Sequence, residues 1–158
     1  MKQLLKEFAA YHVWANQQLV TCILSLDPLN WTKEIPSSFP SLHKTLLHMW
    51  DADSIWWQRL REIKPVSVPS ENFNGNTTEL VRELLTQDKL WFNYVQSLPE
   101  NAFLTNFTYS NMKGEQYEQP LFQVLTHLFN HGTYHRGQLV TMLRNLGLQK
   151  LPQTDYVH

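Results

Sequence analysis

Four segments of the chain carry apolar residues at helical spacing, and proline-containing connections separate them. The first covers residues 3–25, the second begins at Ser41 and stops before Pro65, the third follows Asn76, and the fourth begins at Pro120. Apolar side chains that recur every three or four residues form one buried stripe along a helix. Four long amphipathic helices in 158 residues predict an all-α fold, and a four-helix bundle is the simplest architecture for it.

Residues typical of helix ends stand at the borders of these segments. Ser41 is a good N-cap residue, and Asn76 with Glu79 three positions later has the pattern of a capping box. At the end of the fourth segment, Gly147 can take the left-handed conformation that often closes a helix. These signals support the predicted helix boundaries.

The connection before the last helix has a different pattern. Residues 103–109 partly alternate between apolar and polar, residues 111–114 are typical of a turn, and residues 115–118 can return as a second strand. We therefore expect a short hairpin or irregular crossover there. Pro120 then suits the first position of a helix, where the N–H that proline lacks is not needed.

Composition limits the classes of function. Apolar residues make up 42% of the chain and the formal net charge is −1, with lysine and arginine scattered, so nothing indicates nucleic-acid binding. No window reaches the roughly 20 apolar residues of a membrane span. Cys22 is the single cysteine and is expected to pack in or against the core. We expect one cytoplasmic domain over residues 1–158 that binds a small-molecule substrate.

Three histidines recur at every fourth position in the fourth segment: His127, His131 and His135. A step of four residues climbs about 6 Å along a helix and turns only about 40° beyond a full turn, so neighbouring members of this series share one face. Two such imidazoles can bind one metal ion, as in the HExxH zinc helices. The glutamate of that motif is absent. Spacing alone permits either His127/His131 or His131/His135 as the pair.

A pair of imidazoles needs a third ligand from another part of the chain. His48 lies in the middle of the second segment among apolar residues, where a histidine is either a core residue or a ligand. Beside a pair that lacks a third donor, we interpret it as a ligand. Gly132 and Gly137 each cost roughly 1 kcal/mol inside a helix, which often reflects the close approach of another group.

These motifs resemble the DinB/YfiT-like family of metalloenzymes. The resemblance is carried by residues 130–139 with their His-Arg-Gly-Gln sequence, by residues 41–53 of the second segment, by residues 11–16 and by residues 152–157. It therefore spans essentially the whole chain. It implies a four-helix bundle of up-down-down-up order that usually forms a homodimer.

The resemblance also implies a divalent metal site with one ligand from the second helix and two from the fourth. On this sequence those positions are His48, His131 and His135. Zinc is the first expectation for three histidines with an open position, and nickel or another first-row ion the second. Arg136 is expected in a structural ion pair or an interface contact. The residues expected to support the site as second-shell residues are His127, Asn130, Tyr134 and Gln138.

Relatives in this family include transferases that use low-molecular-weight thiols such as mycothiol or bacillithiol, and a mycothiol-dependent maleylpyruvate isomerase. The resemblance thus implies a metal-dependent S-transferase that activates a thiol cosubstrate, with no side chain assigned as a general base. One alternative is a metal-dependent hydrolase that uses metal-bound hydroxide. Another is a stress protein that binds a metal or ligand without catalysis.

Overall fold

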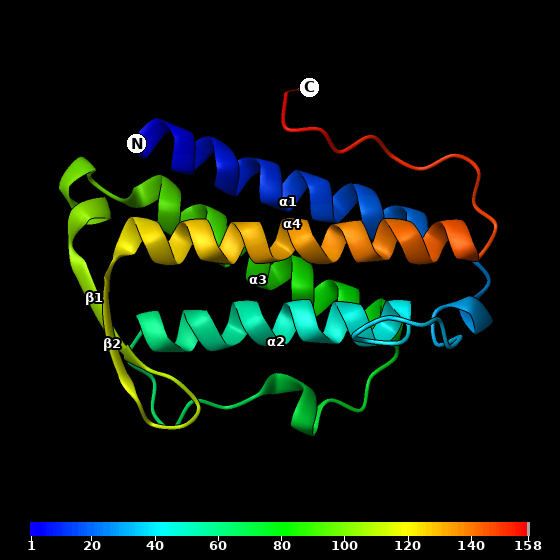
Figure 1. Ribbon diagram of the computed structural model, residues 1–158, viewed down its shortest axis with the longest axis horizontal. Helices are drawn as coiled ribbons and strands as arrows, with labels where there is room; N and C mark the ends of the chain where they lie inside the picture. The colour runs from blue at the N-terminus through cyan, green and yellow to red at the C-terminus, as the bar shows by residue number, and fades with distance from the viewer. Residues whose placement is uncertain (158) are drawn as a thin grey trace.

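The computed structural model describes residues 1–157 and is mostly helical, with four long α-helices and a small two-stranded sheet (Figure 1). Three short 3₁₀ helices lie in the connections. In chain order the elements are α1 (Lys2–Leu24), η1 (Pro28–Asn30), α2 (Leu42–Leu60), η2 (Pro69–Asn72), α3 (Thr77–Ser97), η3 (Glu100–Leu104), β1 (Asn106–Ser110), β2 (Gln116–Pro120) and α4 (Leu121–Asn145).

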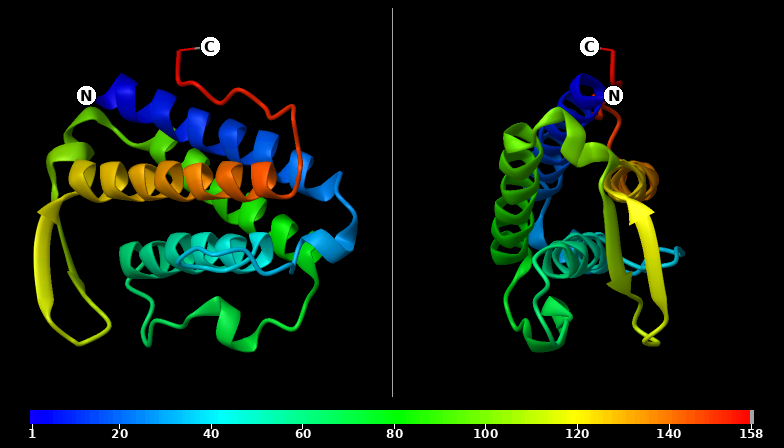
Figure 2. Two further views of the ribbon diagram at one scale, coloured as in Figure 1. Left: turned by 45° about the vertical axis from the view of Figure 1, so that its right-hand side comes forward. Right: turned by 90° about the vertical axis from the view of Figure 1, so that its left-hand side faces the viewer.

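Each long helix packs against two others. The contacting pairs are α1 with α3, α1 with α4, α2 with α3 and α2 with α4. Figure 1 shows that α1 and α4 run in one direction while α2 and α3 run in the opposite direction. Figure 2 shows the hairpin standing across one end of the helices. None of the helices in residues 1–157 combines the length and apolar character that crossing a membrane requires.

The helix ends use the caps expected from the sequence. The Ser41 hydroxyl accepts the Lys44 N–H at 3.0 Å at the start of α2. At the start of α3, Asn76 and Glu79 form a capping box with distances of 3.1 and 2.8 Å. Gly147 follows α4 with φ of +93°, the left-handed conformation that glycine adopts without a steric cost.

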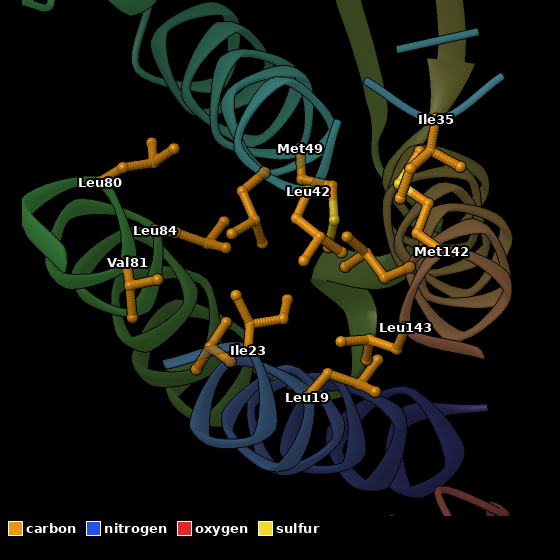
Figure 3. Close-up of a cluster of buried hydrophobic side chains, with 13 residues drawn as sticks. Leu19, Ile23, Ile35, Leu42, Met49, Leu80, Val81, Leu84, Met142 and Leu143 are labelled. Carbon is orange, nitrogen blue, oxygen red and sulfur yellow. The ribbon is translucent and has the colours of Figure 1, made fainter. Parts of the chain in front are cut away.

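Apolar side chains form two buried clusters between the helices. Figure 3 shows the first, to which all four helices contribute. The second lies nearer the hairpin and includes the fully buried rings of Trp91, Phe103 and Phe129. The free thiol of Cys22 packs against the first cluster as expected. Burial raises the pKa of this thiol, which disfavours the reactive thiolate.

The hairpin exists, but its boundaries differ from the prediction. Phe103 and Leu104, expected to begin the first strand, instead end the 3₁₀ helix η3. β1 pairs with β2 in antiparallel register from Asn106 opposite Pro120 to Ser110 opposite Gln116. Pro120 is the last residue of β2 and caps α4, so the helix begins at Leu121 and not at the proline. The extended conformation of the proline, with ψ of 140°, suits a strand end better than a helix.

The segment after α4 runs back alongside α1, as Figure 1 shows. The Tyr11 hydroxyl donates to the carbonyl oxygen of Thr154 at 2.7 Å. The ring of Tyr156 meets the rings of Phe8 and Tyr11 edge-on, at centroid distances of 5.7 and 5.2 Å. The segment is thus held in place by α1, although it has no regular secondary structure.

Candidate metal centre

Three histidine side chains from two helices meet between α2 and α4. The Nε2 atom of His131 lies 3.1 Å from Nε2 of His48 and 3.0 Å from Nε2 of His135. One nitrogen of each ring lies within 4.8 Å of the others, which makes the group a candidate metal site. The structure thus brings together the three residues that the sequence nominated as ligands.

The geometry follows from helix periodicity and from the packing of α2 on α4. His131 and His135 project from successive turns of α4, and His48 faces them from α2. His127 belongs to the turn before and is exposed, with its ring centroid 6.2 Å from that of His131 and 5.5 Å from that of Trp56. It is therefore His135, and not His127, that joins His131 beside His48.

Two further side chains orient the imidazoles. The Oε1 atom of Gln138 lies 2.8 Å from Nδ1 of His135. An amide oxygen can only accept, so Nδ1 carries the proton and Nε2 of His135 is left with a free lone pair, the form that binds metals. Phe39, in the connection before α2, stacks on His48 with a centroid distance of 3.9 Å and an interplanar angle of 15°.

The surroundings keep the three imidazoles neutral. Burial lowers the pKa of His131 to about 3, and the neighbouring histidines add to this effect because like charges would repel. Burial also lowers the pKa of His48 and of His135. A neutral imidazole is the form that coordinates metal ions, so the residues present suit a divalent cation at neutral pH.

The other predicted supporting residues lie near the site without closing it. Tyr134 is exposed, and its ring meets that of His135 edge-on at 5.0 Å. Asn130 is exposed on α4. Tyr134, Gly137 and Gln138 line a cavity of about 280 Å³ together with residues 35–37. This cavity adjoins the site, because Gln138 belongs to both.

A second polar cluster lies in the interior, and the sequence reasoning missed it. Nε2 of His12 on α1 lies 3.3 Å from Oδ1 of Asp88 on α3 and 3.6 Å from Oδ2 of Asp53 on α2. Asn16 donates to Oδ2 of Asp88 at 2.9 Å. All of these side chains are buried, with 2% or less of their surface exposed. We call this group, with Arg136 of α4, the buried network.

Arg136 connects the buried network to the helix that carries two of the candidate ligands. Its Nη1 donates to Oδ1 of Asn16 at 3.0 Å and lies 3.3 Å from Nδ1 of His12, and its Nη2 donates to Thr133 at 2.7 Å. Arg136 was expected in an ion pair or an interface contact; the contacts observed within residues 1–157 are instead hydrogen bonds in the interior. One sequence pattern could have revealed the buried network: a polar residue within the apolar stripe of a helix, such as Asp88 between Leu84 and Trp91.

Charge balance explains how these groups can be buried. Burial alone would lower the pKa of His12, but Asp88 and Asp53 outweigh it and raise this pKa to about 9. Burial raises the pKa of Asp53 to about 6. The atoms of His12, Asp53 and Asp88 are also close enough to hold a metal ion. Because His12 and Arg136 already supply positive charge against the two carboxylates, we assign the cluster a structural role.

Gly132 allows the buried network to approach α4. A Cβ atom at this position would lie 2.5 Å from Cε1 of His12, which is far inside van der Waals contact. The close approach predicted from the sequence is therefore confirmed at Gly132, where the neighbour is the side chain of His12. It is not real at Gly137, where an added Cβ would meet nothing within 4 Å.

The two glycines should respond oppositely to the same substitution. Gly137→Ala should raise the free energy of unfolding by roughly 0.5–1 kcal/mol, because alanine favours the helix and the space is open. Gly132→Ala should lower it by about 1–3 kcal/mol, because His12 must shift. Urea denaturation of both variants measures the difference, and equal effects would contradict this account of Gly132.

Acidification should destabilise the metal-free protein through His131. Its folded-state pKa of about 3 lies below the ordinary value of 6.5, so between these values the unfolded chain binds the extra proton. The free energy of unfolding should therefore fall as the pH drops from about 6.5 towards 3. His131→Asn should flatten this dependence, measured by urea unfolding in the presence of a chelator at about pH 7.5 and about pH 5.

His127→Asn is the matched control for that experiment, because His127 is exposed one turn away on the same helix. It should keep the pH dependence of the wild type. His12 acts in the opposite direction: its contribution is complete below pH 6.5 and is lost as the pH rises through about 9. Parallel pH curves for the wild type and His131→Asn would rule out the assigned role of His131.

Comparison with known proteins agrees with this architecture. The model of the DinB family matches residues 1–158. Protein DinB of Bacillus subtilis is 29% identical over 153 residues, a match that covers 92% of this chain and 87% of the relative. The crystal structure of the DinB-like protein YjoA from Bacillus subtilis matches with a TM-score of 0.66 over 97% of each chain, and at 14% identity this likeness concerns the fold alone. The chain belongs to the DinB family.

Proposed function

We propose that this chain is a divalent-metal-dependent S-transferase that uses a low-molecular-weight thiol at the site formed by His48, His131 and His135. The proposal rests on three imidazoles that converge from two packed helices. Nε2 of His131 lies 3.1 Å from Nε2 of His48 and 3.0 Å from Nε2 of His135. The resemblance to thiol-dependent transferases of the same family supports the choice of reaction.

Three neutral imidazoles would leave a bound ion its full positive charge and an open position, and such an ion favours the nucleophilic thiolate form of a thiol. Zinc is the first candidate for this donor set and nickel or another first-row ion the second. The protein's own residues prepare the site. Gln138 fixes the tautomer of His135, and the ring of Phe39 covers one face of His48 and excludes water there.

The cavity beside the site offers a place for the electrophilic substrate. Its walls combine the exposed ring of Tyr134, the side chain of Gln138 and the bare backbone of Gly137. Because no Cβ stands at Gly137, a flat substrate could lie close to the helix there. Asn130 and His127 are exposed on α4 and do not line this cavity.

We further infer that the four helices form the up-down-down-up bundle typical of the family resemblance. The helix directions in Figure 1 and the four contacting helix pairs support this order. A homodimer is proposed on the same resemblance, and a cytoplasmic location on the single cysteine, which suits a reducing compartment.

Metal content tests the site directly. Protein purified without chelators or a polyhistidine tag should contain close to one divalent ion per chain by mass spectrometry. His48→Ala, His131→Ala and His135→Ala should each lower metal affinity by more than the roughly 10–100-fold typical of losing a residue that only supports a ligand. His127→Ala should retain the metal. A wild type that neither contains nor takes up zinc or nickel would end the enzyme proposal.

The requirement for a thiol separates the proposed reaction from its nearest alternative. Metal-loaded protein should consume bacillithiol or mycothiol in the presence of an electrophile, and His135→Ala should lose this activity while remaining folded by circular dichroism. Turnover of an ester or amide without any added thiol would instead indicate a hydrolase. Stoichiometric metal with neither activity would favour the non-catalytic binding protein.

A further inference from the structure

A second cavity lies away from the three histidines. It has a volume of about 710 Å³ and opens between the C-terminal end of α2, the connection after it and the hairpin. Figure 2 shows the hairpin beside this end of α2, and β1 contacts α2 there. Its walls include Arg59, Tyr109, residues 62–66 and the hairpin turn.

Arg59 is an unusual wall residue because its guanidinium group has no polar partner. The group lies over the rings of Trp56 and Tyr109, with Cζ at 4.8 and 5.5 Å from their centroids. Within residues 1–157 it makes no hydrogen bond or ion pair, and its Nε atom is buried without an acceptor. The two Nη nitrogens also have no protein partner in that range but are not buried, so they are available to a ligand that enters the cavity.

We propose that this cavity binds the carboxylate end of an elongated organic ligand, with Arg59 as the anchoring residue. The two Nη donors of Arg59, which remain accessible while Nε is buried, lie in one plane and match the two oxygens of a carboxylate. The two rings hold the guanidinium group flat, so little entropy is lost on binding. Lys64 also lines the cavity, and together with Arg59 it outweighs the single acid Glu62.

Aromatic rings lead from this cavity towards the histidine site. The ring of Trp56 lies 5.5 Å from that of His127, which lies 6.2 Å from that of His131. Arg59 follows His48 by eleven residues on α2, which corresponds to about 16 Å along the helix. A ligand anchored at Arg59 with a flat or apolar body along these rings would therefore place its far end near the three histidines.

The chemistry of the ligand's far end, near the histidines, rests on the proposed function. The binding of a carboxylate at Arg59 does not. If the histidine site is a thiol-dependent transferase, one of its two substrates is an elongated carboxylate. If the histidine site binds no metal, Arg59 still anchors a carboxylate. The two parts are tested separately.

Phenylacetate is the probe for the anchor, used with metal-free protein so that the result does not depend on the histidine site. It should shift the NMR signal of the Arg59 Nε–H group in a saturable manner, and neutral phenylacetamide should not. Arg59→Gln should weaken binding on the order of tenfold or more. Arg82→Gln is the matched control, because Arg82 is an exposed arginine on α3, and it should bind as the wild type does. Equal binding of the amide, no shift at Arg59, or unchanged binding in Arg59→Gln would overturn the proposal.

The reach between the two sites is tested with zinc-loaded protein and two mercaptocarboxylates. ω-Mercaptoundecanoate, whose extended chain approaches the separation between the sites, should lose affinity in both Arg59→Gln and His135→Ala. Mercaptoacetate is too short to reach both sites and should lose affinity only in His135→Ala. If Arg59→Gln leaves the binding of the long thiol unchanged, the cavity does not serve the histidine site.

Discussion

The buried network is the constraint on which the rest of the structure depends. Burying a charge costs several kcal/mol unless it is paired, so His12, Asp53, Asp88 and Arg136 can be buried only where they meet. Each comes from a different long helix. Apolar packing is not directional, whereas hydrogen bonds of 2.9–3.0 Å between particular atoms allow little displacement. The network therefore fixes the position of α1 relative to α3 and α4, and the contact of His12 with Asp53 at 3.6 Å adds α2.

This constraint reaches the candidate metal centre through α4. His131 and His135 alternate along the helix with Gly132 and Arg136, which contact the buried network. One face of α4 is thus held by Arg136 and its contacts in the buried network, while the adjacent face presents neutral imidazoles to α2. The two clusters also interact electrostatically, because positive charge on His12 contributes to the low pKa of His131. The ionised interior helps to keep the ligands unprotonated, which is the state that metal binding requires.

Sequence patterns predicted the features that depend on one segment at a time. Helix periodicity, the capping box at Asn76 and the four-residue spacing of the histidines are all local, and the structure retains them. Features that depend on pairing between segments were not visible. The spacing of His127, His131 and His135 left two possible pairs, and only the packing of α2 on α4 selects one. The charged partners of His12, Asp53 and Asp88, lie more than forty residues away on other helices, so no local pattern predicts them.

The division between helices and connections has a functional consequence. The candidate ligands project from the middle of long packed helices, where rigid backbone holds them in position. Connections supply part of the surroundings: Phe39 stacks on His48, residues 35–37 line the cavity beside the site, and the hairpin lines the separate cavity at Arg59. Loops tolerate sequence change better than packed helices do. Under the proposed function, substrate choice would change through the connection before α2 and through the hairpin, while the buried network continues to hold the three histidines together.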